Sequence, residues 1–140
     1  MAVRYNKKRH DYGTKWEQKL QPLLEAFVGE PLTKTRHLYD IMDFVSKSYF
    51  VELKCRSKKY HPADFQTWLL PSCKGKEAAK HPDKITIFFY YWETTDELYL
   101  IEYNDPLFQT FHREVPSWHL EKQEHYYVPT EEFSLIEFVE

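Results

Sequence analysis

A carboxylate and an ammonium group stand two positions apart in the segment Phe50-Val51-Glu52-Leu53-Lys54-Cys55-Arg56. Side chains alternate between the two faces of a β-strand, so this spacing predicts that Glu52 and Lys54 share one face. An acid and a base would then be held side by side on a rigid element. Such a pair is also common on the solvent face of an ordinary strand, and this plain structural reading stays open.

A second carboxylate, Asp43, lies upstream in an apolar run, residues 41–45. The polar residues 46–48 between the two runs are expected to turn the chain into a hairpin. Strands in a sheet lie about 4.8 Å apart, so the hairpin would place Asp43 beside Glu52. The apolar run predicts a buried Asp43, and a buried, unpaired carboxylate costs several kcal/mol. Adjacent carboxylates repel unless a proton or cation lies between them, and hard oxygen ligands suit Mg²⁺ or Mn²⁺.

Asp43, the Glu52-Leu53-Lys54 triplet and a preceding helix that carries Glu17 together resemble the core of the PD-(D/E)xK nuclease superfamily. The resemblance covers roughly residues 14–103. Met42 stands where the name of the family has proline, and Asp40 competes with Asp43 for the metal. Because they are three residues apart, these two aspartates face opposite ways in a regular strand, and we prefer Asp43. The details are most similar to small single-domain members from phages and large DNA viruses, some akin to Holliday junction resolvases.

The resemblance implies a Mg²⁺- or Mn²⁺-dependent endonuclease, in which Asp43, Glu52 and the backbone carbonyl of Leu53 hold the metal. Lys54 would position or deprotonate the attacking water, and we expect the nearby acids to favour its charged form. Glu17 has two interpretations, as the helix acid of the site or as a capping residue of its own helix. A lysine near the mouth of the site maps to Lys74, or alternatively to Lys76.

The resemblance further implies that the substrate is DNA, with nicked or branched DNA as one form, and that the protein forms a homodimer. Three alternatives stay open: an RNA-cleaving nuclease of the same fold, a catalytically weak nucleic-acid-binding subunit, and a purely structural module.

Charge is divided unevenly along the chain. The net charge is -3, yet residues 1–76 hold 15 Lys and Arg against 8 Asp and Glu, while residues 77–140 hold 4 against 14. The basic half contains the motif, which favours a nucleic-acid partner. The residues expected to contact phosphates are Lys7, Lys8, Arg9, Arg56, Lys58, Lys59 and Lys74. For the N-terminal cluster, a merely solubilising tail is the alternative.

Composition and length limit the class of protein. The 140 residues suit a single domain, expected at 14–140 after a basic, flexible arm at 1–13, and 18% aromatic residues provide a large core. The longest apolar stretch, 85–92, is too short for a membrane span, and we expect a soluble, intracellular protein without a membrane partner. Three glycines argue against a P-loop or Rossmann nucleotide site.

The pattern of elements predicts an α/β (α+β) fold with a restriction-endonuclease-like core. A central mixed sheet of about four to five strands would be flanked by helices in the order αβββαβ. A helix is expected to open at Thr14 with a capping box, to be kinked or split at Pro22, and to end at Gly29. The remaining elements are one or two short helices in 62–80, strands at 84–92 and 97–103, a short edge strand at 125–128 and a helix from Pro129.

Overall fold

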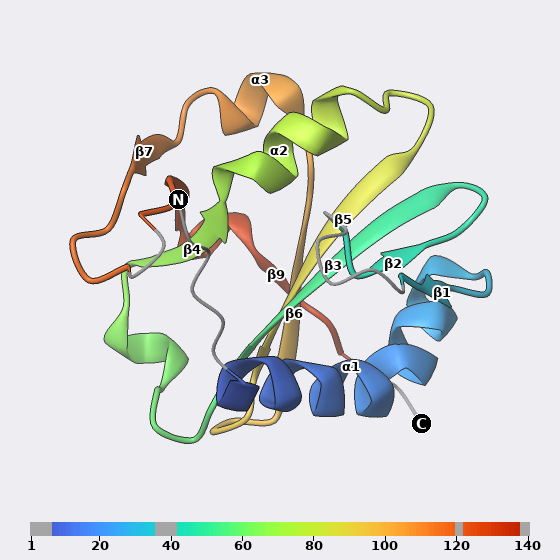
Figure 1. Cartoon of the computed structure of the whole chain (residues 1–140), viewed down its shortest axis with the longest axis horizontal. Coiled ribbons are helices and arrows are strands. Elements are labelled where there is room, and N and C mark those ends of the chain that lie inside the picture. The colour runs from blue at the N-terminus through green and yellow to red at the C-terminus, as the bar shows by residue number, and fades with distance from the viewer. Residues whose placement is uncertain (1–6, 36–41, 120–121, 138–140) are drawn as a thin grey trace.

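The computed structural model describes residues 7–35, 42–119 and 122–137, with side chains from Asp11 onward. Its centre is a mixed sheet of six strands in the order β1-β2-β3-β5-β6-β9, and a second sheet has the order β4-β8-β7 (Figure 1). The predicted α/β class with a central mixed sheet is thereby confirmed, although the sheet has six strands where about four to five were expected. The strands of the main sheet are β1 Thr33–Lys34, β2 Phe44–Val45, β3 Tyr49–Arg56, β5 Ile85–Trp92, β6 Glu97–Glu102 and β9 Ser134–Leu135. The second sheet contains β4 Thr67–Pro71, β7 His112–Glu114 and β8 His125–Pro129.

The first helix, α1, spans Lys7–Val28 and is seven residues longer at its start than the sequence predicts. The prediction of a capping box at Thr14 is therefore wrong, and so is the prediction of a flexible arm for residues 7–13. Residues 1–6 of the predicted arm lie outside the described part. Pro22 lies inside this one helix rather than dividing it. Gly29 ends the helix as predicted, with a left-handed φ of 77° that glycine adopts without strain.

Tertiary contacts explain the early start of α1. The Tyr12 hydroxyl donates a hydrogen bond of 2.9 Å to Glu93 Oε2, at the turn between β5 and β6. The Trp16 ring, one turn further on, packs against Tyr91 with ring centroids 4.6 Å apart. These contacts hold the first turns of the helix against the end of the sheet, and no local sequence signal contains them.

The predicted hairpin is present as β2 and β3, which pair antiparallel with Phe44 opposite Val51. Its turn is anchored from outside. Glu30 accepts hydrogen bonds from the Ser46 hydroxyl and from the Ser48 backbone N–H. Lys84 Nζ donates to the Ser46 carbonyl oxygen at 2.7 Å. The turn that sets the register between Asp43 and β3 is thus fixed by side chains from two other connecting segments.

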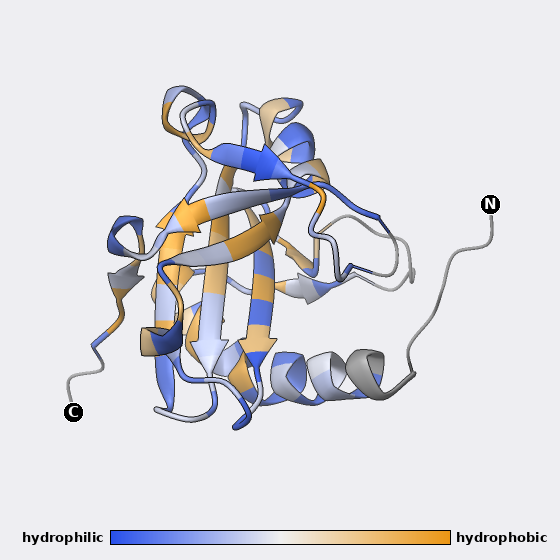
Figure 2. Ribbon diagram, turned by 90° about the vertical axis from the view of Figure 1, so that its left-hand side faces the viewer, coloured by the Kyte–Doolittle hydropathy of each residue, from blue (hydrophilic) through white to orange (hydrophobic). Residues whose placement is uncertain are grey.

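The main sheet separates two hydrophobic cores, because its central strand β5 is apolar on both faces, whereas β3 is apolar only on the face of Val51 and Leu53. Val51 and Leu53 on one face pack with Leu20 and Leu24 of α1. The opposite face of β5 packs against the second sheet through a mostly aromatic core. The buried residues of that core are Trp68, Leu70, Phe88, Tyr90, Trp92, Ile101, Phe108, Phe111, Tyr126, Val128 and Phe133. Figure 2 shows hydrophobic colouring concentrated along the strands.

Helix α2, Ser72–Ala79, follows β4 and lies on the opposite side of the sheet from α1 (Figure 1). A short 3-10 helix, η1, precedes β4 at Pro62–Asp64, so the predicted helices of 62–80 are present, but strand β4 between them was not foreseen. Helix α3, Asp105–Phe108, lies between β6 and β7.

Two predictions near the C-terminus are wrong. The strand at 125–128, expected at an edge, is the central strand of the second sheet. The helix expected from Pro129 is only a 3-10 turn, η2, at Thr130–Glu132, and the chain then forms β9. The cause is that β6 leaves an open edge, with which Ser134 and Leu135 pair. Within the described residues, no helix has both the length and the hydropathy to cross a membrane.

Candidate active site

Asp43 and Glu52 meet where the pairing of β2 with β3 stops. Strand β2 begins at Phe44, so Asp43 lies just outside it, one position before the pair of Phe44 and Val51. Asp43 Oδ2 accepts a hydrogen bond of 2.8 Å from the Leu53 backbone N–H and so takes the place of a ladder acceptor. The prediction of a buried Asp43 in a central strand is wrong, because Asp43 is half-buried at this opening and lies outside β2. Because one residue's N–H and C=O point to the same edge of an extended strand, the Leu53 carbonyl faces this opening too.

Glu52 is the most enclosed carboxylate of the site, with 2% of its surface exposed. Its Oε2 lies 2.9 Å from Lys74 Nζ. Its Oε1 is buried and has no hydrogen-bond partner among the described residues. Burial, followed by the nearby charge of Asp43, raises the pKa of Glu52 to about 8. A buried acceptor atom without a donor, on an acid that repels its neighbour, is an arrangement that a cation would stabilise.

Lys54 lies two residues along β3 from Glu52, and the nearby acids favour its charged form as expected, but they are not the largest influence on its pKa. Burial of the ammonium group lowers the pKa of Lys54, and this effect outweighs the attraction of Glu52 and Asp43. The acids near Lys54 could be identified from the sequence, but the burial of its ammonium group could not. A lysine with a lowered pKa has a larger share of neutral amine near pH 7 and can accept a proton.

Glu17 approaches the opening from α1. Burial and then the charge of Asp43 raise the pKa of Glu17 to about 7. Its Oε2 lies 2.8 Å from Nζ of Lys34, a residue of β1. Because α1 begins at Lys7, ten residues earlier, the capping interpretation of Glu17 is wrong. Glu17 and Glu52 therefore both interact electrostatically with Asp43. Each of these two glutamates also forms an ion pair with a lysine, Lys34 for Glu17 and Lys74 for Glu52.

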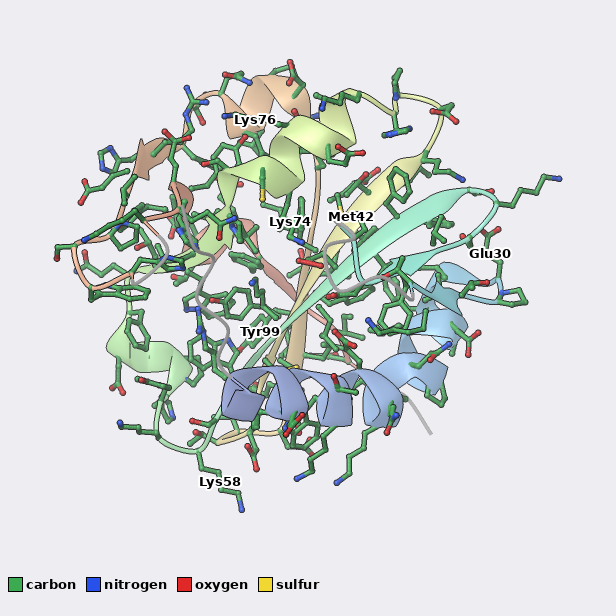
Figure 3. The ribbon with its side chains drawn as sticks, in the orientation of Figure 1. Glu30, Met42, Lys58, Lys74, Lys76 and Tyr99 are labelled. Carbon is green, nitrogen blue, oxygen red and sulfur yellow. The ribbon has the colours of Figure 1, made fainter. Side chains whose placement is uncertain are left out.

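The predicted phosphate contacts are scattered. Lys74 points from α2 towards β3 and Glu52 (Figure 3), whereas Lys76 on the same helix is exposed. Arg56 is half-buried, and its Nε and Nη2 donate to the Tyr90 hydroxyl at 3.2 and 3.0 Å. Arg56 is thus held inside the fold and is not the free surface cation that was expected.

The other predicted contacts lie further out or outside the described part. Lys58 and Lys59 are exposed in the loop that follows β3. The side chains of Lys7, Lys8 and Arg9, and all of Asp40, lie outside the described residues.

The donor atoms fit a hard divalent cation. No three His, Cys, Asp or Glu side chains form a complete metal-binding group among the described residues. Mg²⁺, however, needs only one or two carboxylates and keeps several water ligands. Asp43 and Glu52, with the Leu53 carbonyl beside them, meet that requirement, and the orphaned Glu52 Oε1 supports the fit.

Three residues that position the site were missed by sequence reasoning. Lys34 binds Glu17 and donates to the Asp43 carbonyl at 3.5 Å. Glu30 holds the hairpin turn, and Tyr90 holds Arg56. For Tyr90, the one available sequence signal was its position in a strand that was expected to be central. Pairings between distant elements decide the other two.

Comparison with known proteins gives a likeness in fold. No protein-family model matches the chain, and no curated protein matches it in sequence. The structure is similar to that of a nuclease from a fusselovirus, with a TM-score of 0.54 and 17% sequence identity. The match covers 96% of this chain and 90% of the other. The likeness spans both sheets and α1, and it shows that the two chains share a fold.

Proposed function

We propose that this chain is a Mg²⁺- or Mn²⁺-dependent nuclease of the PD-(D/E)xK type that hydrolyses phosphodiester bonds in DNA. The observation that carries the proposal is the apposition of Asp43 and Glu52 at the open edge of β3, beside Lys54. The fold shared with a viral nuclease supports it. Asp43, Glu52 and the Leu53 carbonyl would hold the metal.

Each residue has a role that follows from its surroundings. A bound divalent metal ion would supply charge neutralisation for the phosphate and make water more acidic. Lys54, with its lowered pKa, accepts the proton of the attacking water. The water oxygen bonds to phosphorus as the P–O3′ bond breaks, and the leaving oxygen takes a proton from solvent. The products are a 5′-phosphate and a 3′-hydroxyl.

Lys74 and Glu17 act on the two metal-binding acids. Lys74 holds Glu52 Oε2 at 2.9 Å and so fixes the direction of the carboxylate. Glu17 adds negative charge beside Asp43, which strengthens the attraction of the site for a cation. Homodimerisation, a preference for nicked or branched DNA, and an intracellular location stay predictions.

The test is cleavage of supercoiled plasmid, linear duplex, nicked, flapped and four-way DNA, and of RNA, with Mg²⁺, Mn²⁺ or EDTA. We expect metal-dependent cleavage of DNA that falls at least 100-fold in Lys54→Met. Lys76→Met is the matched control, since it removes an exposed lysine of α2, and it should cleave like the unmodified protein.

Full activity in Lys54→Met would refute the assignment of Lys54. Cleavage of RNA and of no DNA would show that the substrate is RNA. Binding without cleavage on every substrate would instead favour a non-catalytic subunit.

A further inference from the structure

The connection from β3 to β4, which includes η1, combines exposed positive charge with exposed aromatic rings. Lys58 and Lys59 are exposed, and Figure 3 shows Lys58 extending outward beyond the end of β3. Tyr60 and Phe65 follow, 41% and 42% exposed, with ring centroids 6.2 Å apart. Single exposed aromatic residues are ordinary, but two adjacent rings beside two lysines are a combination that binds nucleic acid strands. We call residues 57–66, which connect β3 to β4 and include η1, the β3–η1 loop.

The β3–η1 loop is held in place by several contacts. The Tyr60 backbone N–H donates to the Ser57 carbonyl at 3.0 Å, and the Thr94 hydroxyl donates to the Tyr60 carbonyl. Phe65 packs on Trp92 at a centroid distance of 5.9 Å. The two rings are therefore presented with little conformational entropy left to lose on binding, which favours affinity.

The 3-10 turn inside the loop is fixed as well. The His61 side chain accepts from the Ala63 N–H, and the Asp64 carboxylate accepts from the His61 N–H. Asp64, the one acid of residues 57–66, is thereby turned to the backbone of its own loop. The lysines at the start of the loop keep a local excess of positive charge.

The position of the loop relates it to the site. Strand β3 carries Glu52 and Lys54 and leads directly into Lys58. At about 3.3 Å per residue, the Cα atom of Lys58 lies at most about 13 Å from the Cα atom of Lys54. This distance is close to four base steps of a stacked strand. A strand whose phosphate lies at Lys54 would thus reach the rings within a few nucleotides.

We propose that the β3–η1 loop binds an unpaired stretch of nucleic acid next to the bond that is cut, with bases stacked on Tyr60 and Phe65. Bases inside a duplex have their faces covered by neighbouring pairs, whereas unpaired bases offer a face to an aromatic ring. Lys58 and Lys59 contact the phosphates of the same stretch. The inference rests on the proposed function for the identity of the site, and it adds that the substrate contains single-stranded nucleotides.

The experiment measures binding by fluorescence anisotropy in EDTA, so that no cleavage occurs. The probes are labelled 12-nucleotide oligo-dT, labelled 12-nucleotide oligo-rU and a labelled 12-base-pair blunt duplex. We expect at least one single-stranded probe to bind more tightly than the duplex. The variant Tyr60→Ala/Phe65→Ala should lose about 10- to 100-fold of that affinity and stay within twofold of the unmodified protein on the duplex.

Two further variants keep the result interpretable. Phe65→Leu retains packing against Trp92 but removes the aromatic face, and it should also weaken single-strand binding while the melting temperature is kept. Phe27→Ala removes a ring that is 46% exposed on α1 and flanked by Ala26 and Val28, and it should bind every probe normally. In Lys58→Gln/Lys59→Gln, the negative slope of log affinity against log salt should become shallower by about 1.4 on a single strand, because each lost phosphate contact contributes about 0.7.

Each outcome decides the proposal. Tighter binding of DNA or of RNA single strands, lost with the rings, supports it and identifies the sugar. Equal affinity of the ring variants and the unmodified protein, or tighter binding of the duplex than of both single strands, overturns it. If that result is obtained and metal-dependent cleavage is still observed, the binding site is refuted and the proposed nuclease function is not. If binding depends on the rings but no substrate is cleaved, the nuclease function is refuted and the binding site is not.

Discussion

Glu52→Gln should change how the stability of the protein depends on pH. Glu52 has a pKa of about 8 in the folded chain, against an ordinary value of 4.5. Between these two values the folded state holds a proton that the unfolded state has released. The free energy of unfolding therefore falls as pH rises through this window.

The magnitude follows from the two pKa values. One pKa unit corresponds to about 1.4 kcal/mol, so Glu52 should remove about 3 kcal/mol of stability between pH 5 and pH 7.5. With a urea m value of roughly 2 kcal/mol/M, that loss moves the unfolding midpoint down by about 1.5 M. Glutamine keeps the shape of the side chain and an oxygen that can accept from Lys74, but it has no proton to lose.

The assay is urea unfolding of both proteins at pH 5, 6, 7 and 7.5, followed by tryptophan fluorescence. We expect the midpoint of the unmodified protein to fall with pH by about 1.5 M more than that of Glu52→Gln. Addition of Mn²⁺ at pH 7.5 should raise the midpoint of the unmodified protein, because binding to the folded state stabilises it, and should raise that of the variant little. Parallel pH profiles for the two proteins would refute the burial and repulsion that we assign to Glu52.

Two further predictions concern α2: one its packing against the second sheet, the other its ion pair with Glu52. Gly75→Ala should destabilise the protein by about 1–3 kcal/mol in thermal or urea unfolding, because a Cβ there would lie 2.5 Å from the hydroxyl oxygen of the buried Tyr126. Gly13→Ala is its control, since nothing lies within 4 Å of the added carbon, and it should gain about 0.5–1 kcal/mol; an equal effect of both changes would contradict the close packing of α2. Lys74→Met should lower stability more at pH 9 than at pH 6, because Lys74 compensates Glu52 only when that acid is ionised. A pH-independent effect, measured by the urea midpoint, would show that Lys74 contributes packing alone.

The parts of the fold that depend on neighbouring residues were predictable. Alternation along 50–56 and the polar residues 46–48 predicted the hairpin, and β2 and β3 form it. The aromatic run of β5 and the turn into β6 were predicted for the same reason. Element type failed where distant partners decide it, as at Ser134 and Leu135, which pair with the open edge of β6 instead of forming a helix.

For the candidate site, the sequence by itself determined which groups are present and their period along β3. Glu52, Lys54 and Asp43 were all identified from spacing and apolar context. Only the tertiary structure decided their chemistry, because the pKa of an ionisable group depends on everything packed around it. Burial lowers the pKa of Lys54 where the sequence suggested the opposite. Helix α2, twenty residues further along the chain, supplies Lys74 to Glu52, and such contacts between distant elements have no signature in a local pattern.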